Sequence, residues 1–412
     1  MKLMRLFILV CCITLLSGCA GFGDSRRCQI KGEPFQGIFP LIKDSAKTTK
    51  VMMVHGVGKH DPGYSTQLRE GLANKMGLNQ ISKITKNITL NDWIETDKEF
   101  GNLRITRSTN EDESHELLFY ELTWSELTDN QKAMLAYDMS GEYSFRRAFV
   151  NEKIKEFTND VLPDQMLYVG DAREDILISV GEALCWMISK PWHDLPVTGN
   201  RACTAVDLKT AVVSMKNDHY AFITHSLGSR IVIDGLQRIA RIHGDKKNER
   251  RVKVKKVLAG KFNQAFRELR IPIFMLANQL PLFQITREPP EITGQYDAYC
   301  RAEGEHYNLR TLSEIDIIAF SDPNDILSYT ITEEFMDRYL DSRLCVDTTN
   351  IDINVADVIG AFGIDYANPL DAHNGYETDE RVIALIAYEV GNKEDTSPII
   401  NESCQILLTT HN

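Results

Sequence analysis

The stretch that most constrains the fold is residues 221–237, AFITHSLGSRIVIDGLQ. The consecutive apolar residues at its start predict a buried strand, and a helical pattern begins immediately after this strand. Ser226 lies at the junction, where a strand that feeds a helix presents functional groups at its carboxyl end. Thr224 and Gly228, two residues before and after it, are small enough for strand and helix to cross closely. The alternative is a buried serine that only caps the helix.

The rest of the chain alternates strands with helices. This alternation predicts an α/β fold with a mostly parallel sheet covered by helices on both faces. Apolar runs predict strands over residues 50–56, 115–124, 219–226, 271–281 and 315–325. Helical periodicity predicts helices over residues 66–76, within 128–190 (most clearly 176–188), up to about 243, and over 379–390.

The N-terminus carries a targeting signal. Lys2 and Arg5 precede an apolar run that is too short to span a bilayer, which is typical of a signal peptide. The sequence Leu-Ser-Gly-Cys19 followed by Ala20 resembles the lipobox of bacterial lipoproteins. This resemblance implies lipidation of Cys19 and a lipid-anchored protein of the cell envelope, with Ala20 favouring the outer membrane. We therefore expect a signal peptide at 1–18, a tether at 19–46 and one domain at 47–412.

Composition excludes several classes of function. The formal net charge is −12, and becomes −14 without Lys2 and Arg5, which argues against nucleic acid as a partner. No CxxC or HExxH spacing indicates a metal, and no cofactor is expected. Six cysteines remain beyond Cys19, an even number in an oxidising compartment: Cys28, Cys185, Cys203, Cys300, Cys345 and Cys404. A Cys185–Cys203 disulfide would close a short excursion, but the sequence leaves the pairing open.

Two motifs resemble the α/β-hydrolase superfamily of lipases and esterases. The pentapeptide THSLG matches the nucleophile motif G-x-S-x-G with Thr224 in place of the first glycine. The strand that ends in His55-Gly56 resembles the superfamily's oxyanion loop. The resemblance places oxyanion-hole amides at Val57 and Leu227, and leaves the side chain of His55 to brace its loop.

Two further stretches extend the resemblance. The expected strand 315–325 ends with Asp322 and Asp325; Asp325 fits the superfamily's acid better, and Asp322 is the alternative. Both could instead only cap the turn. His373 lies in a polar loop before the last helix, where the superfamily keeps its histidine. The order Ser226, Asp325, His373 is that of α/β-hydrolases. His225, next to Ser226, is interpreted as structural.

The resemblance implies a membrane-anchored esterase or lipase that forms an acyl-enzyme on Ser226. A phospholipase, a thioesterase and an inactive hydrolase fold that binds lipid or partners are the alternatives. The long spacing between Gly56 and Ser226 predicts an inserted helical cap at about 125–205. The basic stretch 245–270 is either a solvated face or a patch for anionic lipid head groups. Substrate head group, acyl length and oligomeric state stay open.

Overall fold

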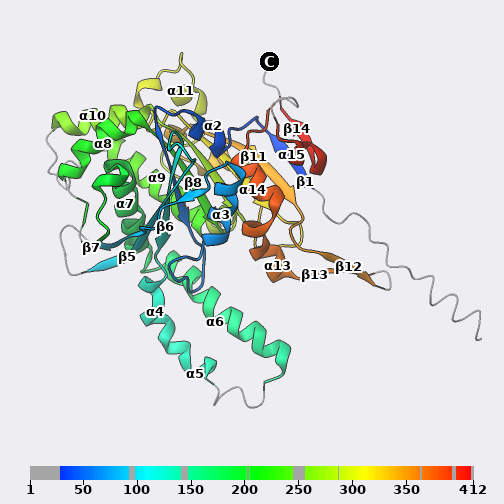
Figure 1. Ribbon diagram of the computed structural model, residues 1–412. Coiled ribbons are helices and arrows are strands. Elements are labelled where there is room, and N and C mark those ends of the chain that lie inside the picture. Colours follow the sequence, from blue (N-terminus) through cyan, green and yellow to red (C-terminus); the bar gives the residue numbers. More distant parts are fainter. Residues whose placement is uncertain are drawn as a thin grey trace, which may run out of the picture.

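A computed structural model describes residues 28–91, 98–140, 147–200, 202–203, 205–244, 256–285, 287–361, 364–391 and 396–409. Its centre is a mixed, mostly parallel sheet of twelve strands (Figure 1). The eleven strands along the sheet are, in spatial order, β14 (Cys404–Leu408), β1 (Cys28–Gly32), β11 (Val346–Ile353), β10 (Glu314–Ser321), β9 (Arg270–Leu276), β8 (Asp218–His225), β2 (Thr48–Val54), β6 (Glu116–Thr123), β5 (Glu99–Thr109), β4 (Lys86–Asn91) and β7 (Thr198–Asn200). β3 (Gln80–Ile81) pairs with β5, and β12 (Val358–Ala361) with β13 (Ile364–Ala367) forms a separate hairpin.

Helices cover both faces of the sheet, as the alternating pattern predicts. One face is covered by α7 (Arg173–Ser189), α8 (Ala205–Asn217), α9 (Gly228–Gly244) and α10 (Lys256–Arg267). The other is covered by α2 (Ile38–Lys43), α3 (Thr66–Lys75), α14 (Glu380–Ala387) and α15 (Pro398–Ser403). Successive side chains of β2 enter opposite cores, Met52 and Val54 on the first face and Val51 and Met53 on the second. Both faces are therefore buried, and the α/β class is confirmed.

The six strands from β11 to β6 are mutually parallel, so their carboxyl ends meet at one edge of the sheet. We call this the carboxyl edge and the opposite one the amino edge. The sequence prediction missed the antiparallel strands β4 and β5, which pair beside β6. It also missed the short helices α11 (Tyr296–Cys300), α12 (Glu333–Tyr339) and α13 (Pro369–Asn374).

Residues 28–43, expected as part of a tether, belong to the folded domain. β1 lies in the sheet between β11 and β14, and Ile30 and Ile38 are fully buried. Gln29 and Lys31 alternate with the buried residues of β1, which makes this outer strand look polar in the sequence. Cys19 and the expected signal peptide lie outside the described residues.

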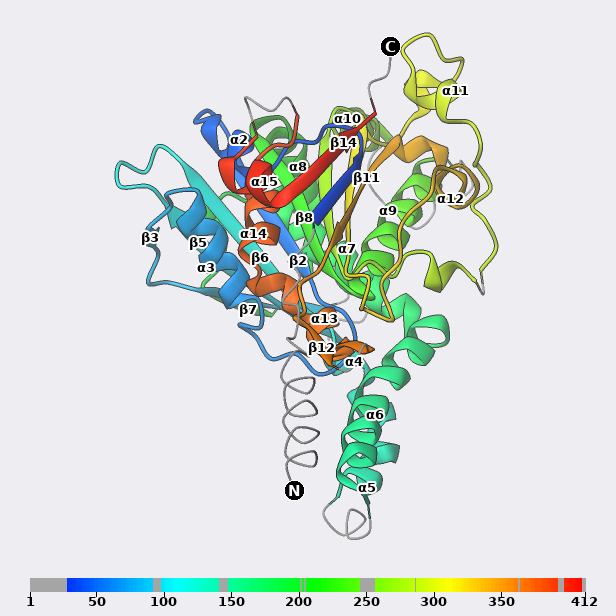
Figure 2. The same ribbon diagram turned by 90° about the vertical axis from the view of Figure 1, so that its right-hand side faces the viewer.

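The expected cap at 125–205 divides into two parts. α4 (Glu126–Lys132), α5 (Ala136–Met139) and α6 (Phe149–Val169) form an arm that projects from the body (Figure 2). α7 instead belongs to the layer on the sheet, where Ile176, Val180 and Met187 enter the core. The apolar face of 176–188 therefore packs on the core and does not line a groove.

Three disulfides join distant parts of the described chain. Cys185–Cys203 is the pair the sequence favoured; Cys28–Cys404 joins β1 to β14, and Cys300–Cys345 joins α11 to the start of β11. Among the helices that the structure describes, none has the length and hydropathy needed to cross a bilayer.

Candidate active site

Ser226 occupies a strained turn at the carboxyl edge, between β8 and α9. Its φ is 55°, a left-handed backbone that is uncommon for a residue other than glycine. The Ser226 amide donates to the Leu276 carbonyl of β9 at 2.9 Å, which fixes the turn. A Cβ at Gly228 would lie 2.3 Å from the Val54 carbonyl, so the start of α9 requires glycine. Strain of this kind persists where the surrounding structure determines the position of a functional side chain.

The structure brings Ser226, His373 and Asp325 together. His373 Nε2 lies 3.1 Å from Ser226 Oγ, and His373 Nδ1 lies 3.0 Å from each Asp325 carboxylate oxygen. Because the carboxylate can only accept, Nδ1 carries the proton and Nε2 can accept one from the serine hydroxyl. All three side chains are buried. The arrangement can remove a proton from the hydroxyl and so raise its nucleophilicity.

His373 lies in a short helix and not in the loop expected from the sequence. α13 begins with Pro369 after Asn368, whose side chain accepts the Leu370 amide. Asn and Pro at these positions start a helix. The polar residues that suggested a loop are therefore the cap and first turn of α13.

The two candidate acids serve different partners. Asp325 faces His373, whereas Asp322 accepts the Val355 and Ala356 amides at 2.7 and 3.1 Å. The other oxygen of Asp322 accepts the amide and side-chain nitrogens of Asn324. Asp322 therefore ties the loop after β10 to the loop after β11 and does not reach the histidine.

Two backbone amides beside Ser226 lack acceptors. Within the described residues, neither the Val57 nor the Leu227 N–H has a protein acceptor. Gly56 presses against the serine, since a Cβ there would lie 2.6 Å from Ser226 Cβ. The loop that follows is fixed by α6 of the arm, where the Asp164 carboxylate accepts the Gly58 amide at 2.7 Å. These amides can stabilise an oxyanion that develops next to Ser226.

The His55 side chain braces this loop. Its Nδ1 donates to the Gly56 carbonyl at 2.8 Å, and Nε2 accepts the Trp124 amide at 3.2 Å. The ring stacks between His60 and Trp124. Burial, and then the charge of His60, hold the pKa of His55 well below its usual value, so the ring is neutral.

His225 contacts the site through the backbone of His373. Its Nε2 donates to the His373 carbonyl at 2.9 Å. Burial, followed by the charge of His373, lowers the pKa of His225 to about 3. A neutral imidazole therefore holds α13 against β8.

Tyr376 is a site residue that the sequence analysis missed. Its hydroxyl accepts the Asp322 amide at 2.6 Å and lies 3.4 Å from Asp325 Oδ2. Asp164 and Trp124, which hold the oxyanion loop, were missed as well. No local pattern marks these residues, because each acts on a segment far from it in sequence.

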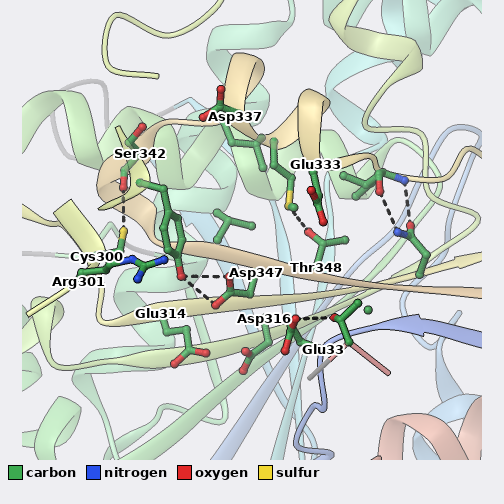
Figure 3. Close-up of a pocket in the computed structure, with 18 of the residues that line it drawn as sticks. Glu33, Cys300, Arg301, Glu314, Asp316, Glu333, Asp337, Ser342, Asp347 and Thr348 are labelled. Atoms are coloured by element: carbon green, nitrogen blue, oxygen red, sulfur yellow. Dashed lines mark hydrogen bonds between the residues drawn. The ribbon is translucent and has the colours of Figure 1, made fainter. Parts of the chain in front are cut away.

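A cleft of about 1020 Å³ lies at the amino edge, away from Ser226 (Figure 3). Its lining is acidic, and several of its carboxylates have partners: Arg270 binds Asp316 at 2.8 Å, and the Tyr296 hydroxyl binds Asp347 at 3.1 Å. Searched over the part of the chain that the structure describes, His, Cys, Asp and Glu form no group able to hold a metal ion.

The basic stretch 245–270 is only partly described. Residues 245–255 lie outside the described residues, and the stretch ends where Arg270 begins β9 at the amino edge.

No family model, no curated protein and no solved structure matches this chain.

Proposed function

We propose that this chain is a serine hydrolase that cleaves carboxylic esters through an acyl-enzyme on Ser226. The observation that carries the proposal is the unbroken hydrogen-bond chain from Ser226 Oγ through both ring nitrogens of His373 to Asp325. The same edge supplies two amides without acceptors, at Val57 and Leu227. A variant of the α/β-hydrolase fold accounts for these features in one framework.

The reaction follows from the protonation states. Ser226 Oγ attacks the ester carbonyl carbon while His373 Nε2 takes the hydroxyl proton. Asp325 keeps the imidazole in the required tautomer and stabilises its cationic form. The tetrahedral intermediate expels the alcohol, whose oxygen receives the proton from Nε2. Water then repeats the sequence on the acyl-enzyme, releases the carboxylic acid and regenerates Ser226.

The oxyanion of each tetrahedral intermediate would bind the Val57 and Leu227 amides. Preorganised donors of this kind contribute about 3 kcal/mol each to the transition state. His55 and Asp164 act as positioning residues, because they hold the backbone that carries the first amide.

A fluorophosphonate probe tests the proposal directly, since it modifies only an activated serine. The wild type should be labelled on Ser226 and should hydrolyse chromogenic esters of increasing acyl length. The Ser226→Ala variant should lose labelling and about six orders of magnitude in kcat. An unlabelled wild type with a native circular dichroism spectrum would favour the inactive, lipid-binding alternative.

The proposed location is the cell envelope, with the protein anchored through lipid on Cys19. The three disulfides of the described chain support an oxidising compartment. Metabolic labelling with a palmitate analogue should mark the wild type and leave Cys19→Ser unmarked.

A further inference from the structure

The arm formed by α4–α6 exposes many large apolar side chains. Its exposed apolar side chains are Met134, Leu135, Tyr137, Phe149, Val150, Ile154, Leu162, Met166 and Val169. The largest fractions are 82% for Met134, 73% for Phe149 and 67% for Met166. A gathering of exposed apolar side chains on one arm indicates an interaction site.

Exposed apolar side chains occur in both halves of α6. Leu162, Met166 and Val169 share one side of its C-terminal half, and Val150 and Ile154 are exposed in its N-terminal half. In the C-terminal half, Asp164 and Tyr168 are buried on the side turned away from Leu162, Met166 and Val169. This half of α6, a helix about 30 Å long, therefore faces the domain with buried side chains and exposes apolar ones on its other side.

Apolar residues of other loops lie at the same edge. The β12–β13 hairpin exposes Ile359 and Tyr366, the loop after β10 exposes Ile326, and α13 exposes Leu370. Figures 1 and 2 both place β12, β13 and α13 on the side of the molecule from which the arm projects. The exposed apolar side chains therefore surround the edge that holds Ser226.

The N-terminal tether leaves from this edge too. β1 is antiparallel to β11, and Cys28, the first residue of β1, pairs with Ile353 at the carboxyl end of β11. The expected lipidated residue, Cys19, is nine positions upstream of Cys28. An extended chain of nine residues spans at most about 30 Å. The tether therefore keeps the carboxyl edge close to the bilayer, whereas the basic stretch 245–270 ends at the opposite edge.

We propose that the exposed side of α4–α6, together with the β12–β13 hairpin, docks on the surface of the lipid bilayer that holds the anchor. The charges of α6 that are not fully buried (Glu152, Lys153, Lys155, Glu156 and Asp160) keep the helix at the interface. Lys153 pairs with Glu156 and Lys155 with Asp138, so the contact depends on apolar burial and not on anionic lipid. Docking holds Ser226 against the membrane and directs its activity to acyl esters embedded there. The docking surface rests on the lipid anchor of the proposed function and does not require catalysis.

The test uses full-length protein with the Ser226→Ala exchange, reconstituted through its anchor into phosphatidylcholine vesicles that contain a nitroxide-labelled lipid. An environment-sensitive fluorophore is attached to Val150→Cys on the arm. The matched control carries it on Leu309→Cys, an equally exposed apolar position (63% in both cases) in the loop that precedes β10 at the amino edge. Both proteins are anchored identically, and neither can turn over substrate.

The nitroxide lipid should quench the fluorophore on the arm about threefold more than the control, because an interfacial helix buries its apolar face by about 5–10 Å. Adding Ile154→Asp and Met166→Asp should remove the difference, whereas Val213→Asp on α8 should keep it. Equal quenching at both positions would overturn the proposal. Shielding of the arm without lipid quenching would also overturn it, and would indicate a second copy of the chain. Failure of the serine assignment would appear only in the fluorophosphonate experiment.

Discussion

The two edges of the sheet use the same residue types for different purposes. At the amino edge, burial and the neighbouring Asp316 carboxylate raise the pKa of Glu314 to about 7, and Arg270 pairs with both acids. At the carboxyl edge, Asp325 faces an imidazole that itself faces a strained serine. Carboxylates at the first edge neutralise charge, whereas Asp325 orients a ring that can move a proton. The group that a carboxylate contacts, more than its burial, therefore determines whether it balances a positive charge or orients an imidazole.

The strongest test of this contrast is a pair of equivalent substitutions. Asp325→Asn should lower kcat about ten-thousand-fold, because the amide favours the wrong tautomer of His373. Asp316→Asn at the amino edge should leave kcat within about twofold and affect only stability, since it removes an ion pair. Steady-state ester hydrolysis and thermal unfolding measure both. Comparable losses of kcat would erase the distinction between the edges.

Two glycines provide the next comparison. Gly56→Ala would push a methyl group into Ser226 and displace the oxyanion loop, which should cost about a hundredfold in kcat. Gly304→Ala at the amino edge would place its methyl 2.4 Å from the Ala298 carbonyl and should destabilise the loop without changing kcat. Measurement of kcat on folded protein separates these effects.

A third substitution sharpens the contrast within the carboxyl edge. The two carboxylate oxygens of Asp322 accept four N–H groups. In Asp322→Asn an NH2 group would replace one of these oxygens and face N–H donors, which should lower the free energy of unfolding by about 2–3 kcal/mol. The fluorophosphonate labelling rate of the folded variant should fall far less than that of Asp325→Asn. Urea denaturation gives the first quantity. A labelling loss as large as for Asp325→Asn would make Asp322 the functional acid.

The smallest expected effect concerns His225. Its pKa is about 3 in the folded protein and about 6.5 in the unfolded chain, so the unfolded state binds more protons between these pH values. Stability contributed by the neutral ring is therefore lost as pH falls from about 6.5 towards 3, with a slope of up to about 1.4 kcal/mol per pH unit. His225→Gln should show a shallower dependence of unfolding free energy on pH over this range. An unchanged slope would exclude His225 as the titrating group.

Local patterns in the sequence predicted five of the six parallel central strands and missed β11. Strands β2, β6, β8, β9 and β10 read as apolar runs because both of their faces are buried. The outer strands β1 and β4 mix polar with apolar residues, so their pattern is ambiguous without knowledge of their neighbours. The division of residues 125–205 into an arm and a packed helix is likewise decided by tertiary packing.

The candidate site residues were predictable where a motif ties chemistry to the end of a strand. Ser226, Asp325 and His373 were found in this way, and the structure brings them together. The sequence favoured Asp325 over Asp322 only by resemblance, because the choice depends on which one reaches α13 and which one meets the Val355 amide. Tyr376 and Asp164 act across long sequence separations, which a single sequence does not show.

The placement of β1 has a consequence for the order of synthesis. β1, the first strand of the described chain, pairs with two late strands, β11 and β14, and Cys28 forms its disulfide with Cys404 of β14. The sheet can therefore close on β1 only after synthesis has reached residue 404 or beyond. A chain truncated before residue 404 would leave an unpaired strand edge beside the tether, where quality-control proteases could recognise it.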